Sequence, residues 1–155
     1  MPYLIDGHNL IGRLRDVSLA DPDDEARLVA LLQAWCTRHR VSATVFFDRG
    51  AAGQPSTAKF GRLTVRFARW PQTADSGMAA FLTQLGRGAS QWIVVSSDGA
   101  VRASARRLGA KTLRSEEFAT GLGGAAGEAA SEKPDRSTPQ EVSDWLRRFG
   151  RKKPR

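Results

Sequence analysis

The chain has 155 residues, 41% of them hydrophobic, which suits one ordinary domain with a real core. Its 24 Lys and Arg residues against 16 Asp and Glu give a net charge of +8, which favours a polyanionic partner, nucleic acid before an anionic membrane surface. The single cysteine, Cys36, excludes an internal disulfide and favours the cytoplasm, and without a signal segment or a run of about 18 apolar residues we expect no membrane association.

Short apolar runs and helical stripes alternate along the chain. Strands are predicted at 2–5, 42–47, 63–69, 92–95 and 110–113. Helices are predicted between and after them at 24–39, 76–86, 99–108 and 115–122. The run at 63–69 alternates apolar with polar residues, as a half-exposed edge strand does. This order predicts an α/β fold, in which a parallel sheet has helices on both faces.

The composition changes after Leu122. Residues 123–137 are small and polar, which predicts a flexible linker after a domain at 1–122. Residues 138–155 then carry the signals of an amphipathic helix with a basic tail: Thr138 as cap, Pro139 at the first position and Gly150 past the end. Its apolar stripe consists of Val142, Trp145, Leu146 and Phe149. We expect this helix to pack on its own domain, on a second copy or on another protein.

Four aspartates follow predicted strands, namely Asp6, Asp48, Asp75 and Asp98. The carboxyl ends of parallel strands meet at one edge of a sheet, where ligands bind in open α/β folds. Each residue alone also suits a structural role, because Asp75 and Asp98 are good helix caps and Asp48 suits a turn. Together they predict a carboxylate cluster.

A cluster of carboxylates needs protons or cations. Two carboxylates about 5 Å apart repel by roughly 3 kcal/mol at an effective dielectric of 20. All-oxygen ligands suit Mg²⁺ or Mn²⁺, and one or two such ions beside a basic surface would serve phosphodiester hydrolysis.

Four motifs carry a resemblance to a known family: LIDGHNLIG, ATVFFDRG, TADSGMAAFL and VVSSDGAVRASARRLGAKTLRSEEF. In order and spacing, they resemble the YacP-like branch of the NYN domains, in the PIN-like nuclease superfamily. The resemblance covers roughly residues 3–119 and leaves the linker and the C-terminal helix outside. It implies a Rossmann-like PIN fold with about five parallel strands in the order 3-2-1-4-5, and divalent-metal-dependent endoribonuclease activity.

The resemblance also assigns residues. It implies that Asp6, Asp48, Asp75 and Asp98 are catalytic and metal-binding. Asn9 and Ser97 match family positions that orient the acids or contact phosphate. His8 departs from the Tyr often found at its position, and Arg49 stands where a Gly is common.

Positions near the predicted site suggest how RNA binds. Arg13, Arg49, Arg102 and Arg106 are expected to contact the RNA backbone. The RNA could be free or part of a ribonucleoprotein, and the alternative function is a non-catalytic module that binds either. A small-molecule phosphatase is disfavoured, because the first motif lacks the Asp-x-Asp of aspartyl-phosphate enzymes.

Overall fold

The computed structural model describes residues 1–14, 24–48, 57–68 and 73–129, with side chains up to residue 122. The strands are β1 (Tyr3–Asp6), β2 (Ala43–Asp48), β3 (Thr57–Phe60), β4 (Leu63–Ala68), β5 (Ile93–Val95) and β6 (Lys111–Leu113). The helices are α1 (Gly7–Ile11), α2 (Asp24–His39), α3 (Ala74–Leu85), the 3₁₀ helix η1 (Gly86–Gln91), α4 (Gly99–Arg107) and α5 (Ser115–Ala129).

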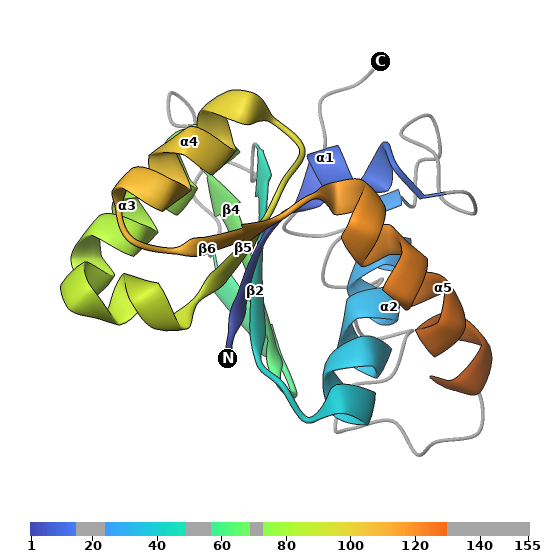
Figure 1. Ribbon diagram of the computed structural model, residues 1–155. Helices are drawn as coiled ribbons and strands as arrows, with labels where there is room; N and C mark the ends of the chain where they lie inside the picture. The colour runs from blue at the N-terminus through green and yellow to red at the C-terminus, as the bar shows by residue number, and fades with distance from the viewer. Residues whose placement is uncertain (15–23, 49–56, 69–72, 130–155) are drawn as a thin grey trace.

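The described strands form one six-stranded sheet in the order β3-β4-β2-β1-β5-β6, with β1 and β2 in the middle (Figure 1). All neighbours are parallel except β3 and β4, which are antiparallel. The prediction of five parallel strands in the order 3-2-1-4-5 is therefore wrong in count and in the full order. The five expected strands do lie beside one another in the predicted order, as β4-β2-β1-β5-β6. The sixth strand, β3, is added at the edge beyond β4.

The sixth strand, β3, lies between the predicted strands at 42–47 and 63–69, where no strand was expected. Thr57–Phe60 turns into β4 through Gly61, whose φ of 63° favours glycine. Only Phe60 of this strand is buried, so the segment lacks the apolar pattern by which a strand is recognised. Because β3 pairs with β4, the segment at 63–69 is not the edge strand that its alternation predicted.

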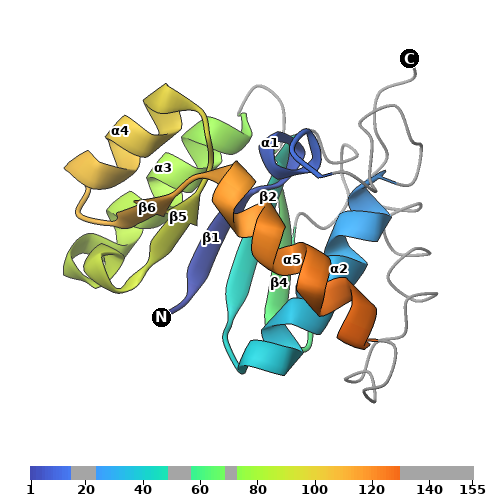
Figure 2. The same cartoon turned by 45° about the vertical axis from the view of Figure 1, so that its right-hand side comes forward.

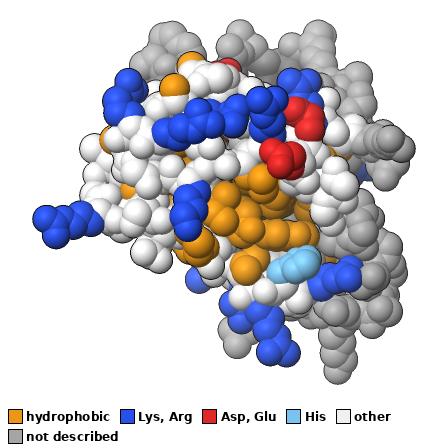
Figure 3. Space-filling view, viewed as in Figure 1, with side chains coloured by type: hydrophobic (Ala, Val, Ile, Leu, Met, Phe, Trp, Pro, Cys, Tyr) orange, Lys and Arg blue, Asp and Glu red, His pale blue; other side chains and the backbone are white. Residues whose placement is uncertain are grey.

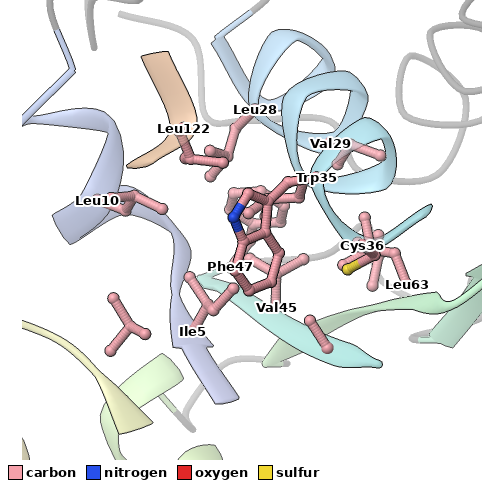
Figure 4. Close-up of a cluster of buried hydrophobic side chains, with 14 of the residues drawn as sticks. Ile5, Leu10, Leu28, Val29, Trp35, Cys36, Val45, Phe47, Leu63 and Leu122 are labelled. Carbon is pink, nitrogen blue, oxygen red and sulfur yellow. The ribbon is translucent and has the colours of Figure 1, made fainter. Parts of the chain in front are cut away.

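Helices cover both faces of the sheet, as Figures 1 and 2 show. Helices α1, α2 and α5 enclose one core, which includes Ile5, Leu28 and Phe47 (Figure 4). Helices α3 and α4 enclose a second core around Leu4 and Met78 on the other face. Fully burying one such side chain contributes about 1.5–3 kcal/mol, so these two cores fix the positions of the strand ends.

The predicted helix at 24–39 is confirmed with the same bounds as α2. The last predicted helix begins at Ser115 as expected but continues past Leu122 to Ala129, into the segment expected to be a linker. The C-terminal helix expected at 138–155 lies outside the described residues. Within the described ranges, no helix is long and apolar enough to cross a membrane.

Helix α1, which the sequence analysis did not predict, begins directly after β1. This sharp start needs glycine at position 7, because an added Cβ would lie 2.6 Å from Cδ1 of Phe47 and 2.9 Å from the carbonyl oxygen of Phe46. Phe47 is fully buried and cannot move aside freely. The close approach of α1 to β2 places Asn9 beside the strand ends.

Gly7→Ala should lower the free energy of unfolding by about 1–3 kcal/mol, because overpacking displaces buried groups. Gly121→Ala is the matched control, since a Cβ there meets no atom within 4 Å. That change should leave stability equal or raise it by up to about 1 kcal/mol, as Ala favours helix. Urea unfolding measures both, and equal stability of Gly7→Ala and the wild type would contradict the steric argument.

Candidate active site

The acidic residues gather where the parallel strands end. Asp6 is the last residue of β1, Asp48 is the last residue of β2, and Asp98 follows β5 and caps α4. Asp75 lies in the first turn of α3, the helix that follows β4 in the sequence. Since β1, β2, β4 and β5 are mutually parallel, these positions share one edge of the sheet.

Asp6 is the most buried of the four aspartates, at 7% exposure. Its Oδ2 accepts a hydrogen bond of 3.1 Å from the hydroxyl of Ser96. Burial, followed by the nearby carboxylate of Asp75, raises the pKa of Asp6 to about 6. The hydroxyl of Ser96 and the backbone N–H of Asn9 oppose this shift, whereas Asp48 adds to it.

Asp75 is electrostatically linked to the other acids. Partial desolvation, followed by the carboxylates of Asp98 and Asp48, raises the pKa of Asp75, although the residue as a whole is exposed. Asp75 therefore acts on Asp6, and Asp98 and Asp48 act on Asp75, so the four carboxylates form one interacting group. The neighbouring carboxylates thus disfavour the charge of Asp6 and of Asp75.

The capping roles expected for Asp75 and Asp98 differ in outcome. Thr73 caps α3 through a capping box with Ser76, so Asp75 has no capping role there. Asp98 does cap its helix, since its Oδ1 accepts hydrogen bonds from the backbone N–H groups of Ala100 (2.8 Å) and Val101 (3.3 Å). The capping explanation thus holds for Asp98 and not for Asp75, whose position in the first turn of α3 still favours the helix electrostatically.

Asp48 is fixed by a hydrogen bond from the neighbouring helix, α3. Its Oδ1 accepts a short hydrogen bond from the backbone N–H of Ala74, the first residue of α3. Asp48 and Asp98 each use one carboxylate oxygen in this way. Their second oxygens make no hydrogen bond within the described part of the chain, which leaves them able to bind another group.

Ser96 connects two of the acids. Its fully buried hydroxyl donates to Asp6 and accepts from the backbone N–H of Asp98 at 3.1 Å. The sequence analysis selected Ser97 and missed Ser96. Ser96 could have been selected from its position, because it is the first polar residue after the buried strand β5 and directly precedes the Ser-Asp pair.

Asn9 and Ser97 fix the loop that carries Asp98. The side-chain oxygen of Asn9 accepts from the backbone N–H of Ser97 at 2.9 Å and from the hydroxyl of Ser115 at 2.7 Å. The hydroxyl of Ser97 donates to Glu116 and accepts from the backbone N–H of Ser115 at 3.0 Å. Both residues are thus engaged within the protein, which supports an orienting role more than a direct phosphate contact.

Glu116 is an acidic residue near the site that the sequence analysis missed. It lies in the first turn of α5, and its Oε1 is 3.4 Å from Nε of Arg13. The hydrogen bond from Ser97 lowers the pKa of Glu116, and Arg13 contributes in the same direction. This contact places Arg13 beside the acidic edge.

The remaining predicted residues have distinct positions. His8 lies on α1, where its Nε2 is 2.7 Å from Oε2 of the buried Glu25, so its role in the fold is to join α1 to α2. Arg102 and Arg106 lie on α4, the helix that begins at the acidic edge. Arg49 lies outside the described residues.

The donor set suits a hard divalent cation, because the interacting groups are carboxylates that repel one another. In the described ranges, however, no group of three His, Cys, Asp or Glu side chains is close enough together to hold an ion. By their chemistry and their mutual repulsion, the four aspartates fit a divalent metal ion. Their positions in this structure do not form a closed set of ligands.

A mostly parallel sheet with an acidic edge and helices on both faces is the architecture of the PIN-like nuclease superfamily, to which the NYN domains belong. The sequence profile of the YacP-like NYN domain matches residues 3–149, and the chain belongs to this family. The match extends well past residue 119. The expectation that the C-terminal segment lies outside the family resemblance is therefore wrong.

Two solved structures are similar to this chain. The structure of Rae1 (YacP) from Bacillus subtilis has a TM-score of 0.69 and 19% identity, and the match covers 84% of this chain and 78% of that one. A point mutant of the same protein has a TM-score of 0.66 and 20% identity, with 81% and 77% covered. At these identities the likeness shows the fold alone. A search of curated proteins found no match.

Asp6→Asn should stabilise the metal-free protein at high pH. The folded-state pKa of about 6 lies above the ordinary value of 3.8, so ionisation of Asp6 disfavours the folded state. The contribution of Asp6 to the free energy of unfolding therefore falls as the pH rises from about 4 through 6. At roughly 1.4 kcal/mol per pKa unit, the fall amounts to up to about 3 kcal/mol. In chelator at pH 8, Asp6→Asn should be about 1–3 kcal/mol more stable than the wild type.

Urea unfolding at pH 4 and pH 8 measures this difference, which should be largely absent at pH 4. Glu117→Gln removes one exposed carboxylate of α5 and controls for the change in net charge. A loss of stability in Asp6→Asn at pH 8 would mean that the carboxylate serves the fold rather than a site.

Proposed function

We propose that the chain is a divalent-metal-dependent endoribonuclease that hydrolyses RNA phosphodiester bonds. The observation that carries this proposal is the mutual electrostatic interaction of Asp6, Asp48, Asp75 and Asp98 at the carboxyl edge of the sheet. Such a group destabilises the metal-free protein, and Asp75, which does not cap α3, takes part in it. Membership of the NYN family makes RNA the expected substrate.

The four aspartates would hold one or two Mg²⁺ or Mn²⁺ ions. A divalent ion, when bound, supplies an activated water and neutralises charge on the phosphate. Binding would also relieve the repulsion that raises the pKa values of Asp6 and Asp75, so these two acids would be ionised in the loaded protein.

The chain's own residues would orient these acids. Ser96 fixes one oxygen of Asp6, the first turn of α3 fixes one oxygen of Asp48, and the first turn of α4 fixes one oxygen of Asp98. Asp75 makes no hydrogen bond to the described residues that would fix it, so it is the acid most able to adjust to an ion or substrate. Outer hydrogen bonds of this kind commonly change metal affinity or activity by about 10–100-fold.

Basic residues beside the acidic edge would bind the RNA backbone. Figure 3 shows Lys and Arg side chains arrayed across the upper part of this face, next to acidic side chains. Arg102 has a buried Nε without a hydrogen-bond partner among the described residues, and Arg106 lies one helical turn further along α4. Together with Arg13 and Arg49, they would offset the repulsion between the aspartates and a phosphate.

A cleavage assay on labelled RNA tests the proposal. The protein should cleave RNA with Mn²⁺ or Mg²⁺, leaving a 5′-phosphate and a 3′-hydroxyl, and chelator should stop the reaction. Asp6→Asn and Asp75→Asn should each reduce the rate by more than about 100-fold, because they remove oxygen ligands. Glu117→Gln is the matched control and should retain the wild-type rate.

Circular dichroism should show that the Asn variants are folded. Full activity of both variants would contradict the assignment of the site. RNA binding with no metal-dependent cleavage would instead favour a non-catalytic RNA-binding module. Cleavage of DNA of the same sequence, at an equal rate, would contradict the assignment of RNA as the specific substrate.

A further inference from the structure

One face of the sheet is only partly covered over β5 and β6. Tyr3 pairs with Ile93, and Ile93 pairs with Lys111, so these three side chains lie on the same face. Two positions along, Leu113 joins that face at the end of β6. Among the described helices, α4 is the one that packs extensively against β6, and it does so from the opposite face, whereas α5 packs on α2.

The partly covered area is apolar apart from Lys111. Tyr3, Ile93 and Leu113 are each half-buried, and Met1, whose Sδ is 3.7 Å from Nζ of Lys111, is 48% exposed. We refer to Met1, Tyr3, Ile93 and Leu113 as the apolar face. The space-filling view shows hydrophobic side chains gathered in a continuous area between the β6 edge of the sheet and α5 (Figure 3).

Aromatic rings border the apolar face on the side of α2 and α5. The ring of Tyr3 lies 4.9 Å from that of Trp35 on α2 and 5.7 Å from that of Phe118 on α5. Both of these neighbours are buried, so the wall is rigid. An apolar element laid along β5 and β6 would therefore meet a flat sheet on one side and a fixed aromatic wall on the other.

We propose that the segment at 138–149 of this same chain docks on the apolar face. Its sequence predicts an amphipathic helix whose stripe consists of Val142, Trp145, Leu146 and Phe149. Parallel sheets in α/β proteins have both faces covered, and the described elements cover this area only in part, where Tyr3 and Leu113 pack against the edge of the core under α2 and α5. The docked segment would complete the second layer of the fold.

The family match supports this occupant. It extends to residue 149, the last residue of the apolar stripe, so the segment belongs with the domain and is not an appendage to it. The basic tail at 151–155 lies beyond the match. A segment that covers the sheet would be a regular part of the domain, and the segment at 138–149 lies inside the family match as such a part would.

The connecting chain is long enough. Ala129, at the end of α5, lies about 16 Å along the helix from Phe118, at 1.5 Å per residue. The residues at 130–137 can span up to about 26 Å when extended, which is enough to bring the segment back beside Phe118. A tether of this length gives an effective concentration of about a millimolar, which favours docking within one chain over docking between two.

Labelling of a thiol placed on the apolar face tests the proposal in the full chain. Leu113→Cys should react slowly with a maleimide, and adding Trp145→Asp and Phe149→Asp should raise the rate by about tenfold or more, because the cover is lost. The native thiol can remain, since burial raises the pKa of Cys36 to about 12 and keeps it unreactive. Ala103→Cys, at an exposed position on α4, is the control whose rate should not change.

A crosslink provides a second measurement that does not depend on the aspartate variants. Oxidised Leu113→Cys combined with Trp145→Cys should form an intramolecular disulfide. Leu113→Cys combined with Arg147→Cys, on the opposite side of the predicted helix, should not. Equal crosslinking of the two pairs would contradict docking through the apolar stripe.

Two further outcomes would overturn the proposal. Protection of Leu113→Cys that increases with protein concentration would mean that a second copy covers the apolar face. If labelling is fast in the full chain and unchanged by the aspartate variants, the segment at 138–149 does not cover the apolar face, and a different partner would have to do so.

Discussion

The burial of one carboxylate, that of Asp6, is the constraint around which the acidic edge of the sheet is organised. Its strand, β1, lies between β2 and β5, so the end of this strand is surrounded by other strand ends rather than by water. A buried carboxylate disfavours its own charge, and the neighbouring Asp75 and Asp48 increase that cost. The hydroxyl of Ser96 and the backbone N–H of Asn9 offset part of this electrostatic cost. A bound cation would offset the rest.

Several features of the fold follow from holding this carboxylate in place. Ser96 donates to Asp6 only because β5 lies directly beside β1. Asn9 can reach Ser97 and Ser115 only because α1 starts at Gly7, where any larger residue would collide with Phe47. The same short helix carries His8 to Glu25 on α2. Packing on one face of the sheet and polar contacts at its edge therefore depend on the same turn.

Much of this arrangement could be predicted from sequence, because its signals are local. Continuous apolar runs mark strands buried on both faces, and α2 has a stripe regular enough to fix both its ends. The four aspartates could be selected because each lies where the chain leaves a predicted strand or begins the helix that follows it, and parallel strands bring such positions together. The fold and the position of the candidate site were thus accessible without coordinates.

What escaped prediction depends on contacts between distant residues or on weak patterns. Ser96 and Asp6 are 90 residues apart, and Asn9 and Ser115 are 106 apart, so no window along the chain reveals these partners. Strand β3 forms because β4 offers an open edge, although Phe60 is the one buried residue of β3. Helix α5 continues through a Gly- and Ala-rich stretch that local propensity assigns to a linker.

The site and the apolar face are connected through β5 and β6. These two strands, of three residues each, end at Val95 and Leu113, directly before Ser96 and near Ser115, so their positions determine how the hydrogen bonds around Asp6 and Asn9 are formed. Helices α3 and α4 support them from one side, while on the other side the core under α2 and α5 covers them only in part. A segment docked on the apolar face would add contacts there and so would hold Ser96, and through it Asp6, more firmly in place.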